Sequence, residues 1–423
     1  MEAIVIRGRN RLRGTVRISG AKNAVLPMLA ATVLTAAECV LHQVPDLRDV
    51  KVMVDILKGL GAEIKEEVDA EGRRTIRVKA SKLVSTQVKE ELTREMRSSI
   101  FLMGPLLGRS GRVMVSQPGG CAIGPRPIDL HLKGLQALGA RIEEKHGYIY
   151  AKATSLSGNL IHLDFPSVGA TENIMMAAVL SRGTTIIQNA AKEPEIVDLQ
   201  NFLNSMGACI KGAGSSVIRV EGVDELGAVE HTVIPDRIET GTFMAAAAIT
   251  GGELRLENVI PEHVEAITAK LREIGVIIHE DRDTIIVQAP ERLRAVDFKT
   301  LPYPGFPTDM QPQMMACMAV AEGTSIITET IFENRFKHAG ELRRMGANIT
   351  TEGRTAIVRG VPRLTGASVE APSLREGAAL ILAGLVAEGP TVMEGVHHLD
   401  RGYEALEVKL QKVGADIRRA DRS

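Results

Sequence analysis

The chain has 423 residues, which is too many for one ordinary hydrophobic core and predicts two large domains. Its 51 lysines and arginines against 52 aspartates and glutamates leave a formal net charge of −1, which excludes a global field for nucleic acid. Aromatic residues make up only 3% of the chain and Trp is absent, so stacking surfaces for single-stranded bases are hard to build. A polar or anionic small-molecule substrate is easier to accommodate.

The N-terminal sequence MEAIVIRGRN lacks the apolar core of a signal peptide. The longest nearly apolar stretches, such as AALILAGLVA from Ala378, are about half as long as a membrane span. We therefore expect a cytoplasmic protein without a membrane partner.

A short phrase recurs six times along the chain, as LKGLGAEI, LQALGARI, LNSMGACI, LREIGVII, LRRMGANI and LQKVGADI. Its shared glycines lie about 70 residues apart, at Gly61, Gly139, Gly207, Gly275, Gly346 and Gly414. Each phrase is typical of an amphipathic helix closed by a left-handed glycine, after which an apolar residue begins a strand. A second strand follows in the first five units, so the pattern predicts an α/β fold of six units, each with a hairpin.

The sixth unit ends at IRRADRS, before its second strand can form, and AIVIRG near the N-terminus has the missing pattern. We therefore expect the N-terminal strand to pair with the sixth unit. The first domain is then residues 22–231, with repeats 1 to 3 and the Cys121 loop. The second is residues 1–21 plus 232–423, with repeats 4 to 6, and a cleft between two such domains is a usual place for a substrate site.

The first stretch with chemical interest is SGAKNAVLPMLAATVLTA, a turn that enters a helix with Pro27 in its first turn. Lys22 and Asn23 then lie at a helix N-terminus, where backbone N–H groups and the helix dipole favour a phosphate or a carboxylate. A solvated lysine before a helix is the alternative, and this stretch alone favours it.

The stretch ELTREMRSSIFLMGPLL predicts one helix. Its buried side consists of apolar residues at helical spacing, namely Leu92, Met96, Ile100, Phe101 and Met103. Arg94 and Arg97 share the opposite face, which is usually only a wet surface. The two arginines become functional candidates if they face the same cleft as Lys22 and Arg126.

The four cysteines, Cys39, Cys121, Cys209 and Cys317, have no CxxC spacing, and all but Cys121 lie in apolar or Ala-rich surroundings typical of inert core residues. Cys121 lies in SQPGGCAIGPRPIDLH, between turn formers and Arg126. A nearby arginine lowers the pKa of a thiol. Cys121 on this Gly-rich loop is therefore a candidate nucleophile or proton donor that closes over a bound anion. An exposed turn with an incidental thiol is an equal alternative.

Three later stretches are ambiguous in the same way. PSVGATEN indicates a turn that can wrap a ligand, followed by a helix capped by Thr171. Asp309 follows Thr308 at a helix start, where it serves as a cap or as a general base for a sugar hydroxyl. Arg401 in HHLDRGYEAL precedes another helix and suits bidentate binding of a carboxylate or phosphate.

The sequence lacks the motifs of several known enzyme classes. It contains no P-loop, no GxGxxG fingerprint, no HExxH and no Cys/His cluster with zinc spacing. No His or Asn arrangement marks a cysteine protease around Cys121. These absences count against nucleotide hydrolysis, hydride transfer and zinc chemistry.

Taken together, SGAKNAVLP, EMRSSI, PGGCAIGPRPIDLH, PSVGATEN, EPEIVD, PDRIETGTF, FPTDMQ, TIFENRF and HLDRGYE resemble the enolpyruvyl transferases. The match runs from Lys22 to the C-terminus in the family's order, and the cysteine loop is its most specific part. The resemblance implies two inside-out α/β barrel domains, each of three repeated strand-helix-hairpin units, with the active site in the interdomain cleft.

The resemblance also implies the reaction, most closely that of the family members that act on UDP-N-acetylglucosamine. They transfer the enolpyruvyl group of phosphoenolpyruvate to the 3-hydroxyl of that sugar nucleotide, with loss of phosphate, as the first committed step of peptidoglycan precursor synthesis. The chemistry is addition followed by elimination, without metal or organic cofactor. The expected partners are these two small-molecule substrates, and no nucleic acid.

Residue roles follow from the same resemblance, motif by motif. It implies Cys121 as the general acid at the phosphoenolpyruvate methylene and the site of a covalent phospholactoyl adduct, and Asp309 as the base toward the sugar hydroxyl. Lys22, Arg126 and Arg401 would hold the phosphoenolpyruvate anion. Further residues are implied in substrate binding: Asn23 and Arg97 for the sugar and phosphates, then Arg126, Pro127, Ile128, Asp129, Leu130, Ser167, Val168, Gly169 and Ile331 for the nucleotide, and Arg375.

One position departs from the family pattern. Where the family usually has Asp-Leu-Arg, this chain has Ser373-Leu374-Arg375, so a carboxylate near the reacting centre is missing while Arg375 is retained. A catalytically impaired, UDP-sugar-binding regulatory relative is therefore one alternative. The other is 3-phosphoshikimate 1-carboxyvinyltransferase, which shares the fold and the donor but lacks the PGGC loop.

Overall fold

The computed structural model describes residues 2–117 and 128–421, and for Arg94, Glu95 and Arg97 it describes the backbone alone. The described chain divides into two compact units. The repeat 1–3 unit holds residues 20–117 and 128–234, and the repeat 4–6 unit holds residues 2–19 and 235–421. We propose that each unit is a domain, with boundaries within a few residues of those expected from the sequence.

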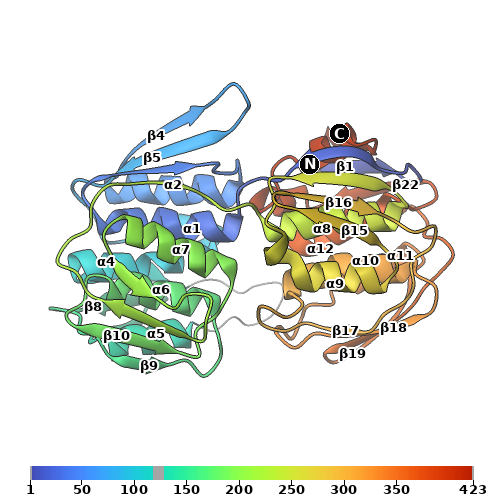
Figure 1. Cartoon of the computed structure of the whole chain (residues 1–423). Coiled ribbons are helices and arrows are strands. Elements are labelled where there is room, and N and C mark those ends of the chain that lie inside the picture. Colours follow the sequence, from blue (N-terminus) through green and yellow to red (C-terminus); the bar gives the residue numbers. More distant parts are fainter. Residues whose placement is uncertain (1, 118–127, 422–423) are drawn as a thin grey trace. The chain divides into compact units, whose positions relative to one another are not determined.

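Figure 1 shows helices and strands alternating throughout both units. The helices of the repeat 1–3 unit are α1 (Lys22–Ala31), η1 (Thr32–Leu34), α2 (Arg48–Leu60), α3 (Glu90–Glu95), η2 (Arg97–Leu102), α4 (Met103–Ser110), α5 (Asp129–Ala137), α6 (Val168–Ala178) and α7 (Pro194–Ser205). Its strands are β3 (Glu38–His42), β4 (Glu63–Val68), β5 (Arg74–Lys79), β6 (Arg112–Ser116), β7 (Arg141–Lys145), β8 (Tyr148–Lys152), β9 (Leu160–His162), β10 (Thr184–Gln188), β11 (Cys209–Lys211), β12 (Val217–Glu221) and β13 (Val229–Thr232).

The repeat 4–6 unit is built in the same way. Its helices are α8 (Arg237–Thr250), η3 (Pro261–Val264), α9 (Glu265–Glu273), η4 (Thr308–Met310), α10 (Gln311–Ala319), α11 (His338–Arg344), α12 (Leu374–Gly384), η5 (Val396–Arg401) and α13 (Leu406–Lys412). Its strands are β1 (Glu2–Arg7), β2 (Arg13–Arg17), β14 (Glu253–Glu257), β15 (Ile277–Asp281), β16 (Thr284–Gln288), β17 (Phe298–Lys299), β18 (Thr324–Thr328), β19 (Asn348–Glu352), β20 (Thr355–Arg359), β21 (Ser368–Glu370), β22 (Pro390–Glu394) and β23 (Asp416–Asp421).

Each repeat supplies one sheet of the described structure. The strand orders are β13-β3-β5-β4, β6-β8-β7 and β9-β10-β12-β11 in one unit, and β2-β14-β16-β15, β17-β18-β20-β19 and β21-β22-β1-β23 in the other. In every four-stranded sheet the first strand of this order pairs in parallel with the second, and the remaining pairs are antiparallel. In the three-stranded sheet a single parallel bridge between Gln87 and Met114 takes the place of the edge strand.

The six repeated phrases form the predicted helix ends, each closed by a left-handed glycine. All six shared glycines have φ between 89° and 106°, the left-handed conformation that closes a helix at low cost only for glycine. A hairpin follows in each of the first five repeats, β4–β5, β7–β8, β11–β12, β15–β16 and β19–β20. In the sixth, β23 pairs with β1, from Glu2↔Asp421 to Arg7↔Asp416, so the N-terminal strand lies where the sequence places it.

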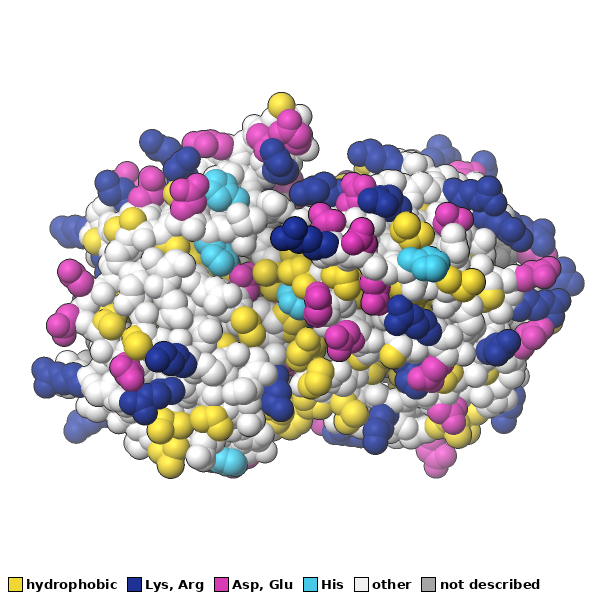
Figure 2. Space-filling view, in the orientation of Figure 1, with side chains coloured by type: hydrophobic (Ala, Val, Ile, Leu, Met, Phe, Trp, Pro, Cys, Tyr) yellow, Lys and Arg dark blue, Asp and Glu magenta, His cyan; other side chains and the backbone are white. Residues whose placement is uncertain are grey.

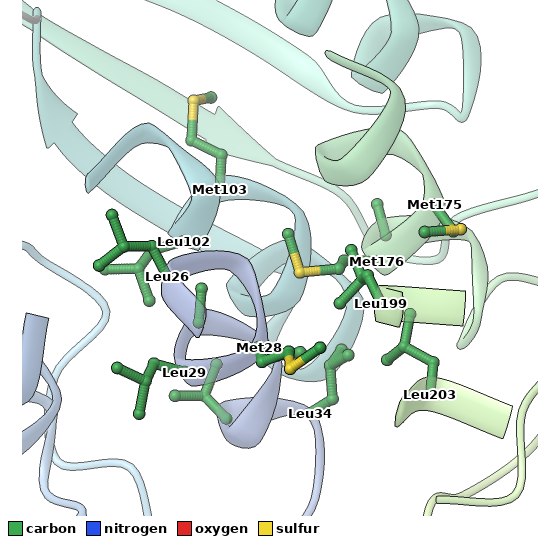
Figure 3. Close-up of a cluster of buried hydrophobic side chains, with 14 of the residues drawn as sticks. Leu26, Met28, Leu29, Leu34, Leu102, Met103, Met175, Met176, Leu199 and Leu203 are labelled. Carbon is green, nitrogen blue, oxygen red and sulfur yellow. The ribbon is translucent and has the colours of Figure 1, made fainter. Parts of the chain in front are cut away.

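The repeat-initial helices lie inside each unit and the sheets lie outside. All but one residue of α1 and of α8 are buried, whereas strands such as β14 and β12 alternate buried and exposed positions. Figure 3 shows the core of the repeat 1–3 unit, where Leu and Met side chains of α1, α4, α6 and α7 converge. The mixed α/β class is confirmed, and its strands form six separate sheets.

The face of the molecule in Figure 2 carries no dominant charge. On the face in Figure 2, basic and acidic side chains are interspersed, in keeping with the net charge of −1. Within residues 2–117 and 128–421, no helix is both long and apolar enough to cross a membrane.

Two local predictions were wrong. The stretch expected as one helix from residue 91 is broken at Met96 (φ −137°, ψ 110°) and starts again as η2 and α4. Pro105 accounts for the later change from η2 to α4, because its ring clashes with the carbonyl four residues earlier and is tolerated only in the first turn of a new helix. Pro27 lies in the second turn of α1 and not in the first, since the helix already begins at Lys22.

The glycine caps give a stability prediction. Gly207 has φ +106° and open space around it, so Gly207→Ala should lower the free energy of unfolding by about 1 kcal/mol through backbone strain alone. Gly59→Ala is the matched control, because Gly59 lies in helix α2 with equally open surroundings. That change should raise the free energy by about 0.5–1 kcal/mol. Urea unfolding measures the change in the free energy of unfolding for both variants. Equal changes of the same sign would contradict the assignment of Gly207 as a cap.

Candidate active site

Several candidate residues occupy equivalent places in different repeats. Each repeat has an internal helix, α1, η2 with α4, α6, α8, α10 or α12, that leads into the first strand of its sheet. Lys22 and Asn23 open α1, Arg97 opens η2, Asp309 lies in η4 just before α10, and Arg375 is the second residue of α12. Helix N-termini present backbone N–H groups and a positive dipole end, so the repeat places these residues at ends that favour anions.

Lys22 is not a solvated lysine. Its side chain is 10% exposed, and its Nζ lies 2.7 Å from Oδ2 of Asp49, whose side chain is 2% exposed. Asp49 belongs to the first turn of α2, so this buried ion pair joins the starts of α1 and α2. An ammonium group carries three N–H donors, so the pair with Asp49 is compatible with a further bond to an anion.

The starts of α5 and α6 lie against each other. Ile128 precedes α5, which Asp129 and Leu130 open, and Val168 and Gly169 form the first turn of α6. A Cβ atom at Gly169 would lie 3.0 Å from Cε1 of His131 in α5. Two of the segments expected to line a nucleotide site are therefore neighbours in the repeat 1–3 unit.

The cap of α6 differs from the prediction. Ser167 is the N-cap, and its Oγ accepts a hydrogen bond from the backbone N–H of Ala170 at 3.4 Å. Thr171 lies inside the helix, and its hydroxyl donates to the carbonyl oxygen of Ser167 at 2.8 Å. Either hydroxyl suits a cap by residue type, and the earlier one begins the helix.

Glu172 is a group that the sequence did not single out. It is fully buried in α6, and neither carboxylate oxygen has a hydrogen-bond partner among the described residues. Burial, together with the nearby charges of Glu195 and Glu193, raises the pKa of Glu172 well above its ordinary value. Burying a carboxyl group without a partner lowers the free energy of unfolding. Such destabilising groups are common where function requires them.

Glu172→Gln should therefore stabilise the protein at neutral pH. The raised pKa means that the folded state holds a proton that the unfolded state has lost, so wild-type stability falls by about 1.4 kcal/mol per pH unit above the ordinary pKa. The variant's gain should be absent below about pH 4.5, where both states are protonated, and should grow as the pH rises. Thermal unfolding across pH 4–8 tests this, with exposed Glu225→Gln as control. A gain that does not depend on pH would contradict it.

Asp309 lies between two buried arginines in the repeat 4–6 unit. Arg335 donates from NH2 to Oδ1 at 3.0 Å, and Arg375 donates from Nε to Oδ2 at 3.1 Å. The side chains of Arg335 and Arg375 are 3% and 4% exposed, whereas that of Asp309 is 30% exposed. Charge-assisted contacts on both oxygens fix the orientation of the carboxylate, and each oxygen has a second lone pair for a further donor.

The two arginines also have donors to spare. Nε of Arg335 and NH1 of Arg375 are buried and have no hydrogen-bond partner within residues 2–117 and 128–421. Burial alone lowers the pKa of the Arg375 guanidinium, but Tyr403, Asp309 and Asp236 outweigh it and raise the pKa. Arg375 is therefore a permanent cation, and its unpaired NH1 suits a carboxylate or phosphate.

Ile331 and Arg401 belong to the same unit. The backbone N–H of Ile331 donates to Oε1 of Glu329 at 2.8 Å, which holds the segment after β18. Arg401 is the last residue of η5, where the preceding Asp400 accepts from NH1 of Arg419 at 3.1 Å. Arg419 thus anchors the end of the segment that carries Arg401.

Some predicted residues lie outside what the structure describes. These are Cys121, Arg126 and Pro127, together with the side chains of Arg94 and Arg97. Of the other cysteines, Cys39 and Cys317 are buried, and burial raises the pKa of each thiol to about 12, as expected of inert core residues. Cys209 is half-buried at the start of β11 and is not a core residue.

Known proteins match the chain over nearly its whole length. The family model for EPSP synthase (3-phosphoshikimate 1-carboxyvinyltransferase) matches residues 6–410. UDP-N-acetylglucosamine 1-carboxyvinyltransferase 1 of Symbiobacterium thermophilum is 64% identical over 419 residues, which cover 99% of this chain and 95% of that protein. The protein of the same name from Caldanaerobacter subterraneus subsp. tengcongensis is 58% identical, with 96% and 97% covered.

Solved structures of enolpyruvyl transferases are similar to this chain over its whole length. The enolpyruvyl transferase NikO from Streptomyces tendae has a TM-score of 0.90 at 27% identity, covering 100% of this chain and 99% of that one. EPSP synthase from Acinetobacter baumannii has a TM-score of 0.76 at 19% identity, with both chains fully covered, and shows the fold alone. With the repeats, the helix-start residues and these matches in agreement, the chain belongs to the enolpyruvyl transferase family.

Proposed function

We propose that the chain transfers the enolpyruvyl group of phosphoenolpyruvate to the 3-hydroxyl of UDP-N-acetylglucosamine and releases phosphate, the first committed step of peptidoglycan precursor synthesis. The names of the relatives at 64% and 58% identity support these substrates. The observation that carries the proposal is the carboxylate of Asp309, held by two arginines that retain unpaired donors. The expected cytoplasmic location belongs to the same proposal.

In the addition step Asp309 accepts the proton of the sugar 3-hydroxyl, and the hydroxyl oxygen attacks C2 of phosphoenolpyruvate. Cys121 donates a proton to the methylene carbon in the same step. In the elimination step the thiolate of Cys121 takes a proton back from the new methyl group, and the freed electron pair forms the C2–C3 double bond. The bond from C2 to the phosphate oxygen breaks, and phosphate leaves with the proton that Asp309 had accepted. General acid and base groups contribute about 10²–10⁴-fold each to such reactions. Cys121 is also the proposed site of the covalent phospholactoyl adduct.

The charges around Asp309 support a role as a base whose basicity rises when phosphoenolpyruvate binds. Two flanking cations favour its ionised form but make it a weak base. An anionic donor that binds the unpaired Nε of Arg335 and NH1 of Arg375 would offset those cations and raise the basicity of the carboxylate. Binding of phosphoenolpyruvate would thus activate the base that the acceptor needs.

The other residues are proposed as binding groups. Lys22, Arg126 and Arg401 hold the anionic donor, and Arg375 adds a permanent cation beside Asp309. Asn23 and Arg97 order the sugar and phosphates. The nucleotide contacts are assigned to Arg126, Pro127, Ile128, Asp129, Leu130, Ser167, Val168, Gly169 and Ile331.

Phosphate release from phosphoenolpyruvate tests the proposal, with UDP-N-acetylglucosamine and shikimate 3-phosphate as separate acceptors. We expect release with the sugar nucleotide only, and its loss or strong slowing in Cys121→Ala. Release with shikimate 3-phosphate would instead favour the acceptor named in the family model. Binding of UDP-N-acetylglucosamine without release would favour the impaired relative that Ser373 suggested.

A further inference from the structure

A second buried pair, Glu376 and His338, lies close to the arginines that hold Asp309. Glu376 in α12 and His338 at the start of α11 are both fully buried, and Nδ1 of His338 lies 3.5 Å from Oε1 of Glu376. Among the described residues, neither carboxylate oxygen of Glu376 and neither ring nitrogen of His338 has a hydrogen bond of good geometry, although Ser373 also lies close enough to Glu376 to lower its pKa. Buried polar groups this poorly satisfied are rare and call for an explanation beyond stability.

Chain connectivity links this pair to Asp309. Glu376 directly follows Arg375, and His338 lies three residues after Arg335, about one helical turn away. Arg335 and Arg375 reach Asp309 from these two segments, one in the turn just before α11 and one in the first turn of α12. The Glu376–His338 contact therefore joins the two segments whose separation sets the geometry around Asp309.

Charge balance gives the pair a second effect. Glu376 adds a carboxylate beside the pair of arginines that hold Asp309, and Asp236 adds another near Arg375. Burial raises the pKa of Glu376, but His338, Ser373 and Arg335 outweigh it, so the pKa lies below its ordinary value and the carboxyl is ionised at neutral pH. Loss of that anion would make the surroundings of Asp309 more positive and so make Asp309 a weaker base.

We propose that Glu376 and His338 are positioning residues, which hold Arg335 and Arg375 at the separation that orients Asp309. This rests on the proposed function, in which Asp309 is the base. Besides its own helix neighbours Ser373 and Arg375, Glu376 is faced by Arg335 and His338 from the α11 side and by His398 of η5.

The kinetic test uses Glu376→Gln, which removes the charge and keeps the shape, with Glu376→Asp as the conservative variant. We expect the acidic limb of the kcat–pH profile to move down by about one pH unit in Glu376→Gln, because Asp309 then loses its proton at lower pH. We also expect kcat to fall about tenfold with little change in KM for UDP-N-acetylglucosamine, and Glu376→Asp to restore part of both. Glu341→Gln on α11 is the control, since its carboxylate contacts Arg344 and the backbone of Glu370 and none of the cluster.

An unchanged pH profile in a folded Glu376→Gln variant overturns the proposal, and so does an equal shift in Glu341→Gln. A crystal structure of Glu376→Ala gives a readout that needs no activity. We expect at least one of the two arginine contacts to Asp309 to lengthen beyond 4 Å, and retention of both overturns the proposal. If wild-type protein releases no phosphate, the proposed function fails, and the crystal structure still decides the positioning role.

Discussion

Asp309→Asn should lower kcat by about 10²–10⁴-fold, because the amide cannot accept the proton of the acceptor hydroxyl. Asn has almost the same shape as Asp, so KM for the sugar nucleotide should change far less than kcat. The amide N–H₂ would also face one of the two arginines, Arg335 or Arg375, in place of an accepting oxygen. Steady-state phosphate release, measured as kcat and KM separately, is the readout.

Two controls make the loss in Asp309→Asn interpretable. Thermal unfolding must show a folded variant, since removing one charge from a buried cluster can cost about 3–5 kcal/mol. Asp297→Asn matches the change at a carboxylate of the same unit, whose Oδ1 accepts only the backbone N–H of Ile326 at 2.7 Å. A folded Asp309→Asn that keeps kcat within tenfold of wild type would contradict the role of Asp309 as base.

Lys22→Met should both destabilise the protein and abolish turnover. It leaves the buried carboxylate of Asp49 without the ammonium that lies 2.7 Å away, which costs about 3–5 kcal/mol in comparable buried pairs. It also removes a cation proposed to hold phosphoenolpyruvate. Urea unfolding measures the first effect, and the KM for phosphoenolpyruvate together with kcat measures the second.

The double variant Lys22→Met/Asp49→Asn separates the two effects. It should recover part of the stability, since the buried negative charge is removed together with the ammonium, while activity stays lost. Lys51→Met is the control, because the pair of Lys51 with Asp46 is exposed and should be worth no more than about 1 kcal/mol. If the double variant regains both stability and turnover, Lys22 has only a structural role.

The fold was predictable because its signals are local. A glycine that ends an amphipathic helix, followed by alternating apolar residues, specifies a cap and a hairpin within about 20 residues, and the phrase occurs six times. The missing last strand at IRRADRS then indicated the pairing of β1 with β23. The break at Met96 was missed, because apolar residues at helical spacing continue across it and no Gly or Pro marks it.

Residues of the candidate site were predictable only where a local sequence motif contains them. Asp309 was singled out at a helix start, but its partners Arg335 and Arg375 lie 26 and 66 residues away, and no local pattern joins them. Lys22 read as solvated for the same reason, since its burial depends on Asp49 in another helix.

Glu172 and Glu376 were missed because a glutamate in the first two turns of a helix usually faces water. Each is fully buried here because its helix lies inside the unit, with apolar residues on every side of the following turns. Burial of this kind depends on how the three repeats pack around their internal helices, and a single sequence shows that packing only indirectly.

The most direct test of the central claim is to identify the product, by mass spectrometry and proton NMR, after incubation of wild-type protein with phosphoenolpyruvate and UDP-N-acetylglucosamine. The account predicts a sugar nucleotide with an intact diphosphate, a new ether at the 3-position with two vinyl protons, and one phosphate released per acceptor consumed. Phosphate release while the sugar nucleotide stays unchanged would contradict it, because the protein would then hydrolyse phosphoenolpyruvate without transferring the enolpyruvyl group.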